Sequence, residues 1–293
     1  MIKLSFSSEV KEELSKINNL VNKELVQAEL IGYLISNNTS ITNEYIKFAT
    51  ESEYNINRFS KLLNNVNIID YQIDMQGKSF VITFIQKAIE ELVVLKNNNI
   101  YITEINDDEE YIKALIRGIF LGSGSMNNPA NKYHLEIALS TKESAIVIFK
   151  ILNEIGIKVK SLDGKNSYSL YIKDGEEISK FLAFIGANKA VLKFEEVRVV
   201  RHMNNKVNRL VNCETANMNK TMNAAVEQIE AIQHLKKTKK FDKLEDSLKE
   251  IAQIRLEHPD SPLSELGKYL KNPIGKSGVN YRLKKIIEIA KEN

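Results

Sequence analysis

The sequence predicts an α+β fold in which one unit is duplicated, followed by an all-helical C-terminal domain. Two observations carry this prediction, an internal repeat and a change in the spacing of apolar residues. The repeat consists of three matches in the same order: residues 30–38 with 116–124, 61–64 with 150–153, and 79–82 with 167–170. Their offsets are 86, 89 and 88 residues, so the repeated unit is some ninety residues long. In the last third of the chain, apolar residues recur at helical spacing.

Each copy is expected to contain helices and strands in the same order, judged from helical spacing and from apolar–polar alternation. In the first copy we expect a helix over residues 22–35, a strand over 45–49, a helix over 53–65, strands near 68–73 and 80–85, and an apolar helix over 88–95. In the second copy we expect a helix over 109–121, a strand over 133–139, a helix over 142–155, strands near 157–162 and 168–172, and a helix over 176–185. Two copies related by a pseudo-two-fold axis would bury their sheets and helices against each other.

A glycine lies inside an apolar helix near the start of each copy, and a small polar turn follows it. The first copy has Gly32 before Asn37 and Asn38, and the second has Gly118 before Ser123 and Gly124. Together with the repeated order of elements, this pattern resembles the LAGLIDADG homing endonucleases, whose fold is a duplicated αββαββα pseudo-dimer. The resemblance implies that the glycines let the two helices approach closely at the seam between the copies.

The same resemblance implies an acidic residue at the C-terminal end of each helix, where it binds the divalent metal that cuts DNA. The matching positions hold Asn37 and Ser123. Neither side chain supplies a charged oxygen ligand for a divalent cation, and metal-assisted cleavage depends on such ligands. We therefore expect degenerate former metal positions, with no catalytic residue, no bound metal and no cofactor.

Longer strings resemble one further family, the WhiA family of bacterial sporulation and cell-division regulators. The strings are residues 6–14, 197–201, 208–217 and 276–283, and the similarity covers essentially the whole chain. The resemblance implies a degenerate LAGLIDADG-type domain joined to a helix-turn-helix domain, and a role as a transcription factor in sporulation or cell division.

Composition bounds the class of protein. A chain of 293 residues that is 43% hydrophobic and 27% charged fits two or three globular domains. The first residues carry Glu9, Glu12 and Glu13 and form no long apolar run, so we expect no signal peptide, no membrane span and a cytoplasmic, nucleoid-associated location. The single cysteine, Cys213, cannot form an internal disulfide and is expected to be buried, and the four scattered histidines make a zinc site improbable.

The charge is uneven along the chain. Residues 1–200 hold 23 Lys and Arg against 26 Asp and Glu, whereas residues 201–293 hold 18 against 12. Phosphate contacts supply most non-specific DNA affinity, so a DNA-binding surface should be basic. DNA binding is therefore expected in the C-terminal third.

We expect a duplicated domain over residues 1–200, a linker over 201–240 and a helix-turn-helix domain over 241–293, with the repeats at about 1–96 and 106–186. The linker should be one amphipathic helix that ends in a basic hinge, because apolar residues recur at 4-3-4-3 spacing before a lysine-rich run. The apolar set is Met218, Met222, Ala225, Ile229 and Ile232, and the hinge is Lys236–Lys240.

The other side of the linker helix is rich in amides, at Asn208, Asn212, Asn219 and Asn223. These amides either contact phosphates or a partner, or they fasten the helix to the first domain, and the second interpretation is favoured because Asn often bonds locally. Auxiliary DNA or interdomain contacts are expected from Arg201, Arg209, Asn212 and Asn217.

Three helices are expected after residue 242. The first has Leu244, Leu248, Ile251 and Ile254 on one side and ends before Pro259. Ser261 should cap the second helix, which contains Leu263, Leu266 and Leu270, and residues 271–275 form the turn. The third should start near Ser277 with Val279, Leu283, Ile286 and Ala290 facing inward.

The third helix is the expected DNA-reading element, because basic and amide side chains near its N-terminus suit the major groove. Ser277, Asn280, Tyr281 and Lys284 are expected at base edges, with Lys276, Arg282 and Lys285 at phosphates and Gly278 within the same set. The alternative is a small three-helix appendage with a solvated basic face.

Two other patterns carry no chemistry. Residues 122–125 are rich in Gly and Ser but lack the Gly-Lys-Ser/Thr of a phosphate loop, so they are interpreted as a helix C-terminus. The acidic run 107–110 is interpreted as the start of a helix rather than as a metal site.

The sequence as a whole predicts a non-enzymatic, sequence-specific DNA-binding regulator, with double-stranded DNA and other transcription regulators as partners and no membrane. The alternatives are a residual DNA-processing nuclease, and an adaptor whose duplicated domain binds a protein or ligand.

Overall fold

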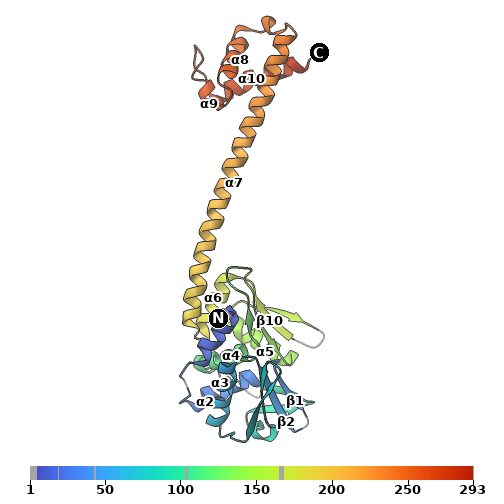
Figure 1. Cartoon of the computed structure of the whole chain (residues 1–293), viewed down its shortest axis with the longest axis vertical. Coiled ribbons are helices and arrows are strands. Elements are labelled where there is room, and N and C mark those ends of the chain that lie inside the picture. The colour runs from blue at the N-terminus through green and yellow to red at the C-terminus, as the bar shows by residue number, and fades with distance from the viewer. Residues whose placement is uncertain (1–4, 19, 43, 103–104, 165–167, 293) are drawn as a thin grey trace. The chain divides into compact units, whose positions relative to one another are not determined.

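The computed structural model of the chain describes residues 5–18, 20–42, 44–102, 105–164 and 168–292 (Figure 1). The chain divides into two compact units, residues 1–202 and 203–293.

The first unit contains both copies of the repeat, and each copy is built on a four-stranded antiparallel sheet. The first copy comprises α2 (Lys23–Leu34), β1 (Thr39–Thr42), β2 (Tyr45–Thr50), α3 (Glu53–Asn65), β3 (Tyr71–Gln76) and β4 (Ser79–Ile85). The second comprises α4 (Glu109–Ser123), β7 (Ser125–Met126), β8 (Leu135–Leu139), α5 (Lys142–Glu154), β9 (Lys160–Asp163), β10 (Tyr168–Ile172) and α6 (Gly175–Phe184). The strand orders, β1-β2-β4-β3 and β7-β8-β10-β9, are equivalent, which confirms the duplicated α+β fold.

Side-chain caps define where the helices of both copies begin. Asn22, Ser52, Asp108, Thr141 and Asp174 are the N-cap residues of α2, α3, α4, α5 and α6, and each accepts a hydrogen bond from a backbone N–H of the first turn. Such caps satisfy donors that the helix itself cannot pair. The acidic run 107–110 therefore contributes a cap at Asp108 and two first-turn carboxylates, as expected for a helix start.

The two sheets bury the side of each strand that faces the helices. In the first copy Ile46 lies opposite Phe84 and Phe48 opposite Ile82, and all four are buried. The ring of Phe48 stacks on Phe59 of α3 at a centroid distance of 4.7 Å. The other side of each sheet faces away from this core.

The prediction of a helix over residues 88–95 is wrong. The structure has a short 3-10 helix η1 (Gln86–Ile89) and then a hairpin of β5 (Val93–Lys96) and β6 (Asn99–Ile102). Val93, Val94 and Leu95 favour a strand, and Asn97 and Asn98 both adopt positive φ, as a two-residue hairpin turn requires. The short strands β1 and β7 were not predicted either.

A helix precedes the first copy and another follows the second. The first is α1 (Phe6–Ser15), whose Glu13 carboxylate accepts hydrogen bonds from the backbone N–H groups of Lys189 and Ala190 at 2.7 and 2.9 Å. Those residues begin α7 (Asn188–Lys237), and the boundary between the two units falls within this helix. Glu13 thereby satisfies free donors at the start of α7.

The second unit continues after α7 with η2 (Phe241–Lys243), α8 (Asp246–Glu257), α9 (Leu263–Leu266) and α10 (Lys276–Lys291). One hydrophobic cluster holds these elements together, and its most buried side chains are Ile232, Leu235, Leu248, Ile251, Leu266, Val279, Leu283 and Ile286. The inward positions expected for the last helix are confirmed at Val279, Leu283 and Ile286.

Two local expectations for this unit differ from the structure. The lysine-rich run 236–240 is not a spacer between modules, because Ile232 and Leu235 before it lie in the same cluster as Leu244 after it. Ser261 does not cap α9, since the N-cap is Pro262, which makes no side-chain cap hydrogen bond. The helix-turn-helix core therefore begins within the last turns of α7.

Candidate functional site

The seam between the two copies is formed by α2 and α4, which we call the motif helices, and each contains one glycine at the contact, Gly32 in α2 and Gly118 in α4. A Cβ built on Gly32 would lie 2.2 Å from the carbonyl oxygen of Leu115, and one built on Gly118 would lie 2.0 Å from the carbonyl oxygen of Glu29. Cβ atoms do not approach backbone oxygens so closely, so only glycine fits at either position. The structure thus contains the close helix pair that the resemblance implies.

Asn37 and Ser123, the positions that the resemblance matches to metal-binding acids, lie at the C-terminal ends of these two helices. Ser123 hydrogen-bonds through its hydroxyl to the backbone of Ala138, accepting from N–H at 3.2 Å and donating to the carbonyl oxygen. Asn37 donates its own backbone N–H to the same carbonyl at 3.1 Å, and its side chain is exposed. Asn38 donates from Nδ2 to the Gly122 carbonyl at 2.8 Å. Neutral hydrogen bonds now join the two helix ends.

In the ranges that the structure describes, no group of three or more His, Cys, Asp or Glu side chains is arranged to hold a metal ion. Gly124, expected at the C-terminus of the motif helix, is the C-cap of α4, and its N–H donates to the Phe120 carbonyl at 2.8 Å.

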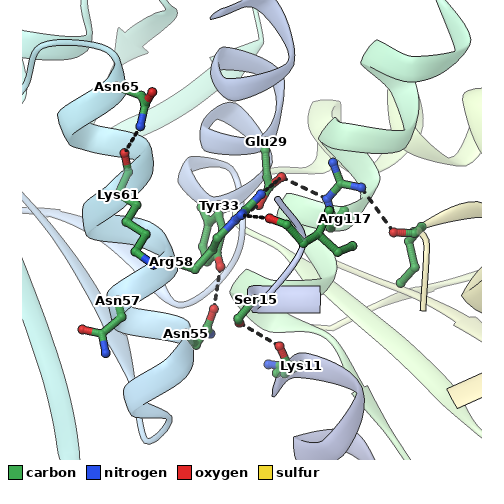
Figure 2. A network of polar contacts seen from close by, with 12 residues as sticks. Lys11, Ser15, Glu29, Tyr33, Asn55, Asn57, Arg58, Lys61, Asn65 and Arg117 are labelled. Carbon is green, nitrogen blue, oxygen red and sulfur yellow. Dashed lines mark hydrogen bonds and ion pairs between the residues drawn. The ribbon is translucent and has the colours of Figure 1, made fainter. Parts of the chain in front are cut away.

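A buried charged cluster lies further along the same seam (Figure 2). Glu29 of α2 sits between Arg58 of α3 and Arg117 of α4. The Arg58 Nε lies 2.7 Å from Glu29 Oε1, and the Arg117 Nε lies 2.9 Å from Glu29 Oε2. All three side chains are at most 8% exposed. Since Arg117 comes from the second copy, the cluster ties the two copies together through one carboxylate.

The buried polar groups beside this cluster also have hydrogen-bond partners. The Tyr33 hydroxyl donates to Asn55 Oδ1 at 2.5 Å, and Asn55 Nδ2 donates to the Leu121 carbonyl of α4 at 2.8 Å. Burial raises the pKa of Tyr33 well above its usual value, and the charge of Glu29 raises it further. The hydroxyl therefore stays a donor, and its role is structural.

The outer sheet faces combine lysines with carboxylates. In the first copy Lys47 lies across from Thr83, which lies across from Gln72, and Asp74 is on the same face two residues further along β3. In the second copy the row is Glu136, Tyr171 and Lys160. A surface that grips DNA along its phosphates would be basic. These rows are mixed in charge.

His134 and Ser169 hold the Glu136 carboxylate in its charged form. The hydrogen bond from Ser169 is the main cause that lowers the pKa of Glu136, and His134 at 3.1 Å lowers it further against the opposing effect of burial. A charged carboxylate on this face repels phosphate, which adds to the mixed character of the sheet.

Two residues of the second unit, Arg255 and Gly267, fix the turns before and after α9, and the second of these turns leads into α10. Arg255 of α8 is buried, and its Nη1 donates to the carbonyl oxygens of Pro259 and Ser261 at 3.2 and 2.8 Å, which fixes the turn before α9. Gly267 follows α9, and a Cβ there would lie 2.1 Å from the Ile274 carbonyl. The turn into α10 is therefore held close to the end of α9.

The DNA-binding candidates on α10 fall into two groups. Lys276, Ser277, Tyr281 and Lys284 are exposed, and Asn280 is half-buried beside them. Arg282 and Lys285 face α8 instead: Arg282 Nη1 lies 3.5 Å from the Ser247 carbonyl, and Lys285 Nζ lies 3.4 Å from Glu245 Oε1.

Gly278 has a packing role. A Cβ at this position would lie 3.1 Å from Ile274 Cδ1, so the residue faces the turn that precedes α10. Five basic side chains against one carboxylate, Glu288, still make α10 strongly positive over residues 276–291.

The auxiliary candidates on α7 differ in their surroundings. Arg201 donates to the carbonyl oxygens of Pro129 and Asn131 and lies 4.5 Å from the ring centroid of Tyr133, so it is engaged within the first unit. Arg209 and Asn212 are exposed, and Asn217 donates to the sulfur of Cys213 at 3.8 Å.

One interpretation of α7 is wrong, that of its cysteine. Asn208, Asn212, Asn219 and Asn223 are exposed. Cys213 is also exposed rather than buried. Apolar spacing located the C-terminal part of the helix but not its start at Asn188, and it could not show which of its side chains are exposed.

Sequence reasoning missed the buried charges. Arg117 follows Ile116 in an apolar helix and precedes the seam glycine, which was a usable signal because an arginine there needs a buried partner. Glu29 and Arg255 gave no comparable signal, since other charged residues occur in the same helices.

Comparison with known proteins identifies related sequences for both units. Residues 112–204 match the family model of the WhiA LAGLIDADG-like domain, and residues 207–290 match that of the WhiA C-terminal HTH domain. A protein of Staphylococcus haemolyticus named probable cell division protein WhiA is 38% identical over 98% of this chain and 96% of its own. One of the same name from Clostridium perfringens is 44% identical over 78% of this chain and 72% of its own.

Solved structures give the same result. The crystal structure of full-length WhiA from Thermatoga maritima has 30% identity and a TM-score of 0.60, covering 98% of both chains. The N-terminal LAGLIDADG domain of WhiA has 27% identity and a TM-score of 0.51, covering 63% of this chain and 92% of that domain. Over the described ranges, none of the helices is both long and apolar enough to cross a membrane.

Proposed function

The chain belongs to the WhiA family, and from that premise we propose that it is a sequence-specific DNA-binding regulator of cell division or sporulation. The observation that carries the proposal is the exposed start of α10, where Lys276, Ser277, Tyr281 and Lys284 surround Asn280 on a helical unit with one hydrophobic core. A helix of this kind enters the major groove with its N-terminal side chains at base edges. Such a regulator would work on the nucleoid.

The name of the two relatives supports the cell-division part of the proposal, since both are called probable cell division proteins. The proposal includes other transcription regulators as partners, without assigning them a surface. The first unit is proposed to be a homing-endonuclease scaffold without nuclease activity, because its helix ends carry Asn37 and Ser123 in neutral hydrogen bonds.

The first prediction concerns the reading helix. Asn280→Ala should weaken binding to the preferred site by about 1–3 kcal/mol and leave binding to random DNA nearly unchanged, because an amide at a base edge carries sequence information. Because Lys284 is exposed whereas Lys285 faces Glu245, we assign the phosphate contact expected of Lys285 to Lys284 instead. Lys284→Ala should weaken both and lower the slope of log affinity against log salt by about one, because each phosphate contact releases a counterion. Fluorescence anisotropy across a salt series measures both quantities.

The same titration contains its own controls. Lys291→Ala removes a charge from the far end of α10, where Lys291 Nζ lies 3.1 Å from Glu227, and it should change neither affinity nor slope. Lys285→Ala should lower the slope less than Lys284→Ala, because Lys285 already faces Glu245. Normal DNA binding by both Asn280→Ala and Lys284→Ala would exclude α10 as the reader and favour the adaptor function.

The second prediction concerns cleavage. The protein should neither cut nor nick supercoiled DNA in Mg²⁺ or Mn²⁺, because the seam offers no carboxylate at the positions of Asn37 and Ser123. An Asn37→Asp/Ser123→Asp variant should also be inactive, since the outer sheet rows are mixed in charge and do not grip phosphates. Nicking activity that copurifies with the wild-type protein and disappears in a Ser123→Ala variant would support the residual nuclease instead.

A further inference from the structure

The middle of α7 presents a band of apolar side chains to solvent. Residues 202–224 are all exposed, and six large apolar side chains among them are 51–61% exposed. We call these six the α7 stripe: Met203, Val207, Leu210, Val211, Met218 and Met222. At 3.6 residues per turn they fall within roughly a third of the helix circumference.

The opposite side of the same stretch is polar and basic. It carries Asn205, Arg209, Asn212, Asn219, Lys220 and Asn223. An amphipathic helix of a folded protein normally turns its apolar side toward a core. The hydrophobic cluster of the second unit reaches Ile232 and Leu235 but does not extend to the α7 stripe.

The composition of this stretch makes an uncovered helix unfavourable. Residues 203–224 contain seven asparagines, together with valines and threonines, all of which are weak helix formers. Isolated helices are marginal in water even when they are rich in alanine, and most helical stability in proteins comes from packing one side of the helix. The stretch therefore depends on a partner that covers the stripe.

We propose that the α7 stripe is a dimerisation surface, on which a second copy of this chain packs its own stripe in antiparallel orientation. The positions of the stripe residues indicate this occupant. Met203 and Met222 are equally far from the point between residues 212 and 213, and so are Val207 and Met218. A two-fold axis through that point places Met203 of one copy against Met222 of the other, and the reverse, as an isologous interface requires.

The area of the stripe is sufficient for a specific contact. Two stripes of six half-exposed Met, Leu and Val side chains would together bury on the order of 1,200 Å², the lower end of the range for stable protein–protein interfaces. A single stripe, about half of that area, is also at the upper end of what monomeric proteins leave exposed.

Glu214 is a charged residue within the apolar surface and should weaken the dimer. It lies on the stripe side of the helix, one turn from Val211 and Met218 and close to the proposed axis. A charged residue in an apolar helix seam lowers affinity and disfavours alternative registers. Glu214→Leu should therefore tighten self-association, a gain that misfolding would not produce.

Analytical ultracentrifugation of the full chain without DNA tests the proposal independently of any DNA-binding function. The wild type should pass from monomer to dimer between low and high micromolar concentration. A Val207→Gln/Met218→Gln variant should weaken the dimer by at least about tenfold, because two apolar contacts per copy are lost. Gln is a good helix former, so circular dichroism should show no loss of helix.

The matched control carries the same change on the polar side, as Asn205→Gln/Asn219→Gln, and should dimerise like the wild type. A chain that stays monomeric at high micromolar concentration overturns the proposal, and the stripe is then covered by another part of the same chain or by a different protein. Equal weakening by the stripe variant and the control also overturns it.

Disulfide cross-linking tests the orientation. In a Cys213→Ser background, Met203→Cys and Met222→Cys proteins should cross-link to each other when mixed and oxidised, and neither should cross-link when alone. The two positions lie 19 residues apart on the helix, roughly 28 Å, so one geometry cannot mimic the other. Cross-linking of Met203→Cys alone would show a parallel pair and overturn the antiparallel arrangement.

Discussion

Gly118→Ala is expected to lower the free energy of unfolding of the first unit by about 3 kcal/mol or more. The new Cβ would lie 2.0 Å from the Glu29 carbonyl oxygen and 2.9 Å from its carbon. These are backbone atoms of a buried helix, so no side chain can rotate away to make room. Relief requires α2 and α4 to separate, which opens the core that both helices bury. Urea unfolding followed by circular dichroism, with hydrogen exchange resolved to α2 and α4, measures the loss.

A second helical glycine provides the control. Gly278→Ala in α10 places a Cβ 3.1 Å from Ile274 Cδ1, the end of a flexible side chain, and should change stability by less than about 1 kcal/mol because alanine also favours the helix. Gly32→Ala should resemble Gly118→Ala, since its Cβ would lie 2.2 Å from the Leu115 carbonyl. A Gly118→Ala protein as stable as the wild type would show that the helices are not in backbone contact.

Glu29→Gln is expected to destabilise the first unit by about 3–5 kcal/mol, the usual cost of breaking a buried ion pair from one side. The change removes the carboxylate that the guanidinium groups of Arg58 and Arg117 share at 2.7–2.9 Å. Two like charges would then face each other in a site that excludes water. Thermal and urea unfolding measure the effect.

The charge balance of the Glu29 cluster predicts which variants lose the most stability. Arg117→Met leaves one carboxylate with one guanidinium, so it should cost less than Glu29→Gln, although Arg117 also contacts the Ile185 carbonyl at 3.4 Å. Glu12→Gln, which alters an exposed pair with Lys16, should have no measurable effect. Glu29→Gln and Glu12→Gln proteins of equal stability would contradict the buried-charge interpretation.

The sequence predicted the features that follow from spacing and from glycine. The repeat offset located both sheets, and Gly32 and Gly118 marked the seam before any contact was visible. The last helix was predicted within one residue of its start, because Val279, Leu283 and Ile286 repeat at helical spacing.

The features that were missed depend on distant partners or on turn conformation. The apolar run 92–95 fits helix and strand equally, and only the positive φ of Asn97 and Asn98 decides for the β5–β6 hairpin. The Glu29 cluster joins residues 29, 58 and 117, which no local pattern connects. In α7, apolar spacing does not distinguish the buried Ile232 from the exposed Met218, because burial depends on which element lies opposite.

The contact of α2 with α4 also determines the order in which the protein can fold during synthesis. Each motif helix is covered by the helix of the other copy, 86 residues away along the chain. The first repeat therefore leaves the ribosome with the Gly32 side of α2 still without its cover, and it cannot complete its core as an N-terminal domain usually does. The nascent chain must carry this apolar surface until α4 has been made, and the two copies then fold in a single cooperative step.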